Sequence, residues 1–100
     1  MAHRIKQRQK IHDKKVQEVA RRLRRAGYFV RADLPGHPRP PRFGGAIPDI
    51  YAHKKGKKLI YEIETPKSLK TDIEMRQALA RAADRAGAEF RILVAREKII

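Results

Sequence analysis

The segment over residues 35–45 constrains the fold most, because it cannot adopt regular structure. It reads PGHPRPPRFGG and holds four prolines and three glycines in eleven residues. Proline lacks the backbone N–H that helices and sheets use, and clustered proline and glycine mark turns and loops. The chain has 100 residues, which is the length of one domain. A loop this long in so small a domain is usually functional or mobile, so the helices and strands must lie on either side of it.

A helix and a strand are predicted before this loop. The helix runs from about residue 13 to residue 26, because apolar residues recur there at offsets of three and four, namely Val16, Val19, Ala20 and Leu23. Asp13 is a candidate N-cap, and Gly27 is a natural residue just past the end. The basic residues 1–12 are predicted to be a flexible arm or an extension of this helix, with residues 13–100 forming the domain. The strand covers residues 28–34.

Two strands, a helix and a final strand are predicted after the loop. Residues 48–53 and 58–65 read as a hairpin, with a turn at residues 54–57. Thr71 and Glu74 have the spacing of a capping box, which predicts a helix start at Thr71. An apolar stripe follows, made of Met75, Leu79, Ala82, Ala83 and Ala86, and both Met75 and Leu79 are expected in the core. Gly87 would close this helix, and residues 89–95 form the last strand.

The element order is therefore α-β-β-β-α-β. We expect a small α/β protein with a four-stranded mixed sheet flanked by helices. The last strand should run parallel to the strand to which the second helix connects it.

The charge of the chain favours a polyanionic partner. Lysine and arginine number 25 against 11 acidic residues, which gives a net charge of +14. Nucleic acid is the first candidate, an anionic membrane surface the second, and a basic coat that only confers solubility the third. The chain has no cysteine, no apolar run long enough to span a membrane and no signal peptide, so a soluble cytoplasmic protein without a membrane partner is expected.

Three carboxylates stand out against this basic background. Side chains alternate along a strand, so Glu62 and Glu64 share one face of the strand 58–65. The hairpin pairing brings Asp49 near them. Crowded carboxylates raise one another's pKa unless a cation lies among them. That cation is either a lysine or arginine or a divalent ion with oxygen ligands, such as Mg²⁺ or Mn²⁺. The histidines His12, His37 and His53 lack zinc-site spacing and are expected to be exposed.

These residues resemble the PD-(D/E)XK nuclease superfamily, which includes restriction endonucleases and archaeal Holliday junction resolvases. The resemblance covers about residues 13–95 and the predicted element order. Pro48 and Asp49 match the PD of the motif, and Glu62 matches its second acid. It implies a restriction-endonuclease-like core in which Asp49, Glu62 and the backbone carbonyl of Ile63 bind the catalytic metal. A helix glutamate joins this site in the resolvase-like branch, and Glu18 matches it.

One position departs from the motif, because Glu64 stands where the family usually has lysine. In the family this lysine orients the attacking water, although some members carry glutamate there and others are inactive. Lys67 or Lys70, just past the strand, is a candidate to replace it. Gln77 is a second candidate for a polar role at the site.

The sequence therefore predicts a Mg²⁺-dependent endonuclease that acts on DNA as a homodimer, with branched DNA as one candidate substrate. Asp49, Glu62, Glu64 and Lys67 are its expected catalytic residues. Further residues are predicted to bind nucleic acid: Arg21, Arg22, Arg25, Arg39, Arg42, Phe43, Lys70 and Gln77. One alternative is an inactive nucleic-acid-binding module with the same fold. Another is a basic protein that assembles with RNA or with an acidic protein.

Overall fold

In the part of the chain that the structure describes, four strands form one mixed sheet, and their order in it follows their order in the sequence. The computed structural model describes residues 2–96, and side chains from residue 9 onward. The strands are β1 (Phe29–Ala32), β2 (Ile50–Lys54), β3 (Lys57–Glu64) and β4 (Glu89–Val94). β2 pairs antiparallel with both β1 and β3, whereas β3 and β4 are parallel. The predicted α/β class, the hairpin and the parallel last strand are confirmed.

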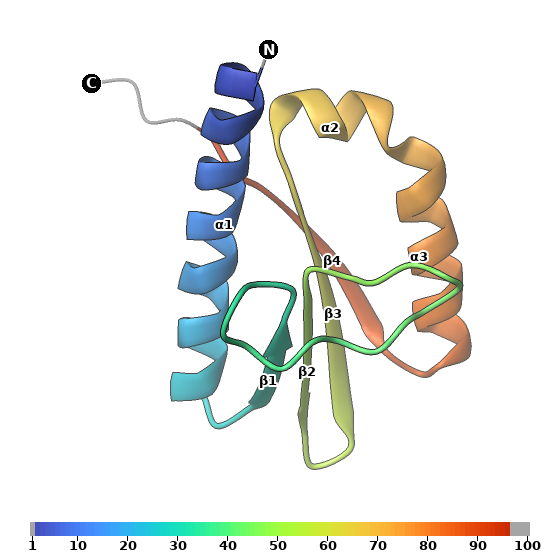
Figure 1. Ribbon diagram of the computed structural model, residues 1–100. Coiled ribbons are helices and arrows are strands. Elements are labelled where there is room, and N and C mark those ends of the chain that lie inside the picture. The colour runs from blue at the N-terminus through green and yellow to red at the C-terminus, as the bar shows by residue number, and fades with distance from the viewer. Residues whose placement is uncertain (1, 97–100) are drawn as a thin grey trace.

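Helices cover the two faces of this sheet (Figure 1). α1 (Ala2–Arg25) lies on one face, and α2 (Pro66–Thr71) and α3 (Ile73–Arg85) lie on the other. Leu59, Tyr61 and Ile63 of β3 join the core beneath α1. The residues of α1 in this core are Val16, Val19, Ala20 and Leu23. The even-numbered residues Ile60, Glu62 and Glu64 are also buried, but strand alternation turns them toward the opposite face. Two glutamates therefore lie in the layer between the sheet and the helices α2 and α3.

α1 is longer than its apolar pattern predicted. It begins at Ala2, so residues 2–12 extend the helix and do not form a separate arm. This extension places His12 inside the helix, one turn before Val16. Met1 and residues 97–100, which were assigned to the arm and to the domain, lie outside the described residues.

The prediction that the second helix starts at Thr71 was wrong. A short helix, α2, comes first, and Thr65 caps it: the Ser68 N–H donates to Thr65 Oγ1 (3.2 Å) while the Thr65 N–H donates to Ser68 Oγ (2.9 Å). Pro66 fits the first helical turn because its missing N–H needs no partner there. Thr71 ends α2 and does not cap the next helix. Met75 was expected in the core, yet it is 37% exposed.

Both predicted helix ends at glycine are confirmed. Gly27 and Gly87 have φ angles of 91° and 70°, a conformation that glycine adopts without strain. Among residues 2–96, no helix has the length and apolar character needed to cross a membrane.

Candidate functional site

Asp49 and Glu62 meet where β2 begins and β3 approaches its end. The Ile63 N–H donates to Asp49 Oδ2 (2.7 Å), and the Asp49 N–H donates to Glu62 Oε1 (3.2 Å). The strand register explains this contact, because Ile50 is paired with Tyr61 and the preceding residue therefore lies beside Glu62. The expected convergence of Asp49 and Glu62 is thus observed.

The Glu62 carboxyl is buried beside another acid. Only 4% of the residue is exposed. The pKa of Glu62 is raised to about 8, first by burial and then by the negative charge of Asp49, while the hydrogen bond from the Asp49 N–H acts in the opposite direction. A carboxyl with this pKa lacks a cation that would favour its ionised form.

His12 reaches Asp49 from α1. Its Nε2 atom lies 3.1 Å from Asp49 Oδ1, and its Nδ1 atom lies 3.0 Å from Asp13 Oδ1. Only an imidazolium donates at both ring nitrogens. The hydrogen bond with Asp49 raises the pKa of His12 to about 9, against the opposing effect of burial. The expectation of an exposed His12 was wrong, because most of its side chain is buried and only 22% is exposed.

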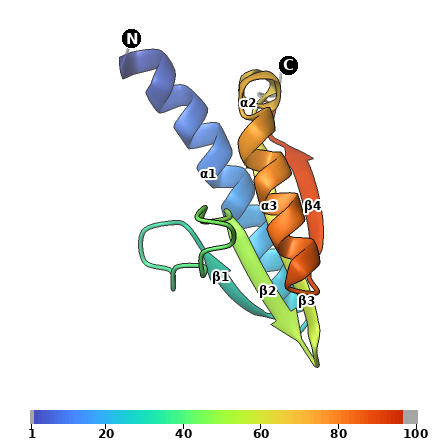
Figure 2. The same cartoon turned by 90° about the vertical axis from the view of Figure 1, so that its right-hand side faces the viewer.

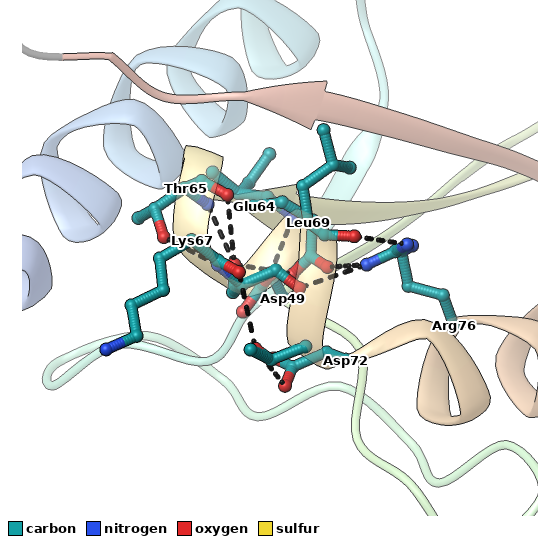
Figure 3. Close-up of polar contacts among 10 residues, drawn as sticks. Asp49, Glu64, Thr65, Lys67, Leu69, Asp72 and Arg76 are labelled. Atoms are coloured by element: carbon teal, nitrogen blue, oxygen red, sulfur yellow. Dashed lines mark hydrogen bonds and ion pairs between the residues drawn. The ribbon is translucent and has the colours of Figure 1, made fainter.

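Glu64 has its own cation, Arg76 of α3 (Figure 3). Arg76 Nη1 lies 2.5 Å from Glu64 Oε2, and both groups are largely buried. The same guanidinium donates to the carbonyl oxygens of Ser68 (3.2 Å) and Leu69 (2.8 Å) in α2. Arg76 therefore joins α3, α2 and the end of β3.

The three acids line one open cavity of about 420 Å³. Lys67 also lines it, and its ammonium group points away from Asp49 and Glu64 (Figure 3). The remaining lining residues come mainly from α1, the segment before β2, and the helices α2 and α3: Gln9, His12, Ile47, Ile63, Thr65, Ser68, Thr71, Asp72 and Met75. The cavity thus opens among elements from both faces of the sheet.

Other predicted site residues lie elsewhere. Glu18 is exposed and lines a different cavity, together with Lys14, Lys15 and Arg96. Lys70 and Gln77 are exposed and do not line the cavity of Asp49. The residues expected to bind nucleic acid are exposed on α1 (Arg21, Arg22 and Arg25) or occupy the loop 33–49 (Arg39 and Arg42, exposed, and Phe43, half-buried).

Sequence reasoning missed His12 and Arg76, although helical spacing marks both. His12 precedes Val16 by four residues and Val19 by seven, so it belongs to the buried face of α1. Arg76 precedes Leu79 by three and Ala83 by seven, which places it on the buried face of α3. Gln77, the predicted residue, is turned away from that face by one helical step.

Asp49 and Glu62 are the carboxylates of this site that could hold a metal. Among the side chains that the structure describes, in residues 9–96, no group of three or more His, Cys, Asp or Glu is placed to hold a metal. Asp49 and Glu62 supply two carboxylates, and Ile63, whose carbonyl was the further predicted ligand, lines the same cavity. Mg²⁺ usually binds one or two carboxylates and fills its remaining positions with water or phosphate oxygens. The carboxyl with the raised pKa, Glu62, is the one that a cation would stabilise most.

Comparison of the chain with family models, with curated proteins and with solved structures found no match. The function proposed below therefore depends on the residues of this chain and their geometry.

Proposed function

We propose that the protein is a Mg²⁺-dependent endonuclease of the PD-(D/E)XK class that hydrolyses phosphodiester bonds in DNA. The observation that supports this most is the meeting of Asp49 and Glu62 in one open cavity. The protein around this acidic site carries a net charge of +14. A basic surface attracts phosphates, and paired carboxylates suit a metal that acts on them.

Each residue of the site has a distinct role in this proposal. Asp49, Glu62 and the Ile63 carbonyl would hold Mg²⁺ or Mn²⁺, which when bound stabilises charge on the phosphate and lowers the pKa of a bound water. His12 positions Asp49 through its hydrogen bond. Among the described side chains that line the cavity, Lys67 is the lysine or arginine, and it is exposed and would contact a phosphate.

The basic residues outside the cavity would bind the phosphates of the DNA backbone. They lie on α1 and on the loop 33–49, and the exposed ones among them are Arg21, Arg22, Arg25, Arg39 and Arg42. Such contacts position the nucleic acid without reading its sequence.

A cleavage assay with matched variants tests the proposal. The protein is incubated with branched, duplex and single-stranded DNA and with RNA, in Mg²⁺ or Mn²⁺ and then in EDTA. We expect metal-dependent cleavage that is lost in Asp49→Asn and Glu62→Gln. The control is Asp84→Asn, which alters an exposed carboxylate on α3 outside the cavity. Cleavage that survives both site substitutions would exclude this mechanism.

A second candidate is a nucleic-acid-binding module without activity. It is favoured by the two cations that already compensate acids at the site, His12 beside Asp49 and Arg76 beside Glu64. Binding of nucleic acid that is unchanged by EDTA, with no cleavage of any substrate, would support this candidate over the enzyme.

We also propose that the protein acts in the cytoplasm as a homodimer, which would present two cavities to two strands. Sedimentation at high protein concentration tests this assembly. A monomer at every concentration would exclude the dimer and would leave the proposed chemistry of one site untouched.

A further inference from the structure

Four aromatic rings form a continuous row beside the candidate site. Phe29 of β1 stacks on His53 of β2, with ring centroids 5.3 Å apart and an angle of 21° between planes. His53 is followed by Tyr51 at 5.8 Å, and Tyr51 by Phe43 at 5.6 Å. The strand register creates this row, because Phe29 is paired with His53 and because residues two apart on β2 share a face.

The row lies on a part of the sheet that α3 leaves open. α3 packs beside β3 and β4, whereas β1 and β2 extend past it (Figure 2). The neighbours of the row on each strand, such as Val30 and Ala52, are buried beneath α1. Phe29 itself is 72% exposed. Its ring therefore gains little from the core of the protein and is available to a ligand.

The segment that carries Phe43 is held in place over the sheet. The Phe43 and Ala46 backbones exchange hydrogen bonds of 2.7 and 3.1 Å. Between them, Gly44 has a φ of 60°, and a Cβ at this position would lie 3.2 Å from Ala82 Cβ on α3. The loop thus packs closely on α3, which fixes the end of the row.

The surface around the rings is positively charged. A cavity of about 490 Å³ lies against Tyr51 and His53, and its lining includes the cations Arg31, Arg39 and Lys58. The residues that line it include no carboxylate. One of these cations, Arg39, is near an acid outside the cavity, because its Nε atom lies 4.0 Å from Asp33 Oδ1.

We propose that this row binds single-stranded nucleic acid, with bases stacked on the rings and phosphates beside Arg31, Arg39 and Lys58. Stacking on aromatic side chains within a basic groove is how proteins hold single strands without sequence preference, since every base has a flat face. A second copy of the chain is a poorer occupant, because it would bring another +14 charge toward these cations.

The position of the row extends the proposed function and rests on it. Tyr51 follows Asp49 by two residues, and two residues of extended chain span about 7 Å. A strand bound along the rings would lead directly to the carboxylate cavity. The substrate class is therefore nucleic acid that is single-stranded, or branched with a single-stranded arm.

Fluorescence of an introduced tryptophan tests the contact directly. The chain has no tryptophan, so the Phe29→Trp variant gives a signal from the row alone. We expect oligo(dT) and oligo(U) to quench this signal in EDTA, where no metal-dependent cleavage occurs, and the two oligonucleotides separate DNA from RNA as the ligand. The control is Ile92→Trp, an exposed position on the opposite edge strand, where we expect little quenching.

Affinity measurements complete the test. Stacking of one base contributes enough binding free energy that its loss should be measurable. Phe29→Ala or Tyr51→Ala should weaken the binding of oligo(dT) about fivefold or more. Phe29→Leu keeps an apolar side chain but loses the ring, so it should behave like Phe29→Ala. Unchanged affinity in the alanine variants, or quenching that follows protein concentration and not nucleic acid, would overturn the proposal. The second result would indicate a second copy on this surface.

The two proposals fail in different ways. If the fluorescence is quenched in EDTA and in the Asp49→Asn background, but no condition gives cleavage, the stacking surface is retained and the enzyme is excluded. Metal-dependent cleavage without quenching, and without loss of affinity in Phe29→Ala, would retain the enzyme and remove the stacking surface.

Discussion

The Nε2 atom of His12 lies 3.1 Å from Oδ1 of Asp49 and joins α1 to the residue just before β2. The contact links the N-terminal half of α1 to the candidate site. It also places a positive charge beside the Asp49 carboxylate. α1 therefore has a role at the site besides covering the sheet.

Removal of this charge should destabilise the protein. His12→Gln keeps a hydrogen-bonding side chain but loses the positive charge beside Asp49, and a hydrogen bond to a charged group contributes about 2 kcal/mol. We expect a loss of roughly that size in the free energy of unfolding in urea at neutral pH, and a smaller loss when Mg²⁺ is present. Lys14→Gln, which removes a positive charge at an exposed position of the same helix, is the control. Equal stability of the two variants would contradict a structural role for His12.

Arg76 should matter more than its neighbours on α3. Arg76→Met leaves the buried Glu64 without its cation, and loss of one partner of a buried ion pair costs about 3–5 kcal/mol. We expect Arg76→Met to lower the unfolding free energy by about that amount, and Arg81→Met, at an exposed position, to have little effect. The double variant Arg76→Met/Glu64→Gln should recover much of the loss. Additive losses in the double variant would show that the two residues are not coupled.

The order of elements and the meeting of Asp49 with Glu62 follow from local signals in the sequence. Strand alternation and hairpin pairing depend only on short stretches, and these placed the two acids together. The positions of the two cations at the site, His12 and Arg76, do not follow from local signals in this way. His12 lies in a basic stretch whose helical state depends on packing against the rest of the fold. Arg76 lies inside the predicted helix, but its pairing with Glu64 joins two separate elements and does not follow from local spacing.

The incorrect prediction of a helix start at Thr71 has a specific cause. Thr71 and Glu74 have the spacing of a capping box, but Thr65, Pro66 and Ser68 form a box of their own six residues earlier. Two competing caps cannot be ranked from spacing alone, since the chain path after β3 decides which one forms. The aromatic row was missed for a similar reason, because the pairing of β1 with β2 brings Phe29 to His53 across the long loop.

Nucleic-acid binding should weaken steeply with salt. Each lysine or arginine on a phosphate releases about one counterion, so the slope of the logarithm of affinity against the logarithm of salt reports the number of contacts. The double variant Arg39→Ala/Arg42→Ala should reduce this slope by about 2 if both residues contact phosphates. The comparison variant is Arg81→Ala/Arg85→Ala on α3, which should change the slope less. Equal slopes for the wild type and the loop variant would exclude the loop from the interface.

Stability without divalent cations should fall as pH rises, through two groups at the site. The pKa of Glu62 is about 8 against an ordinary value of 4.5, so between these values the folded chain holds a proton that the unfolded chain has released. Its contribution is fully present below pH 4.5 and is lost as pH rises through about 8. The pKa of His12 is about 9 against 6.5, so its contribution is present below pH 6.5 and is lost through about 9.

Urea unfolding in EDTA at a series of pH values separates these two contributions. Glu62→Gln should remove the part of the decline between pH 4.5 and about 8, and His12→Gln the part between 6.5 and about 9. Because Mg²⁺ favours the ionised form of Glu62, added Mg²⁺ should reduce the decline in the wild type but not in Glu62→Gln. A pH profile for Glu62→Gln that parallels the wild type would mean that this carboxyl ionises normally. In that case the site would lack the uncompensated acid on which metal binding depends.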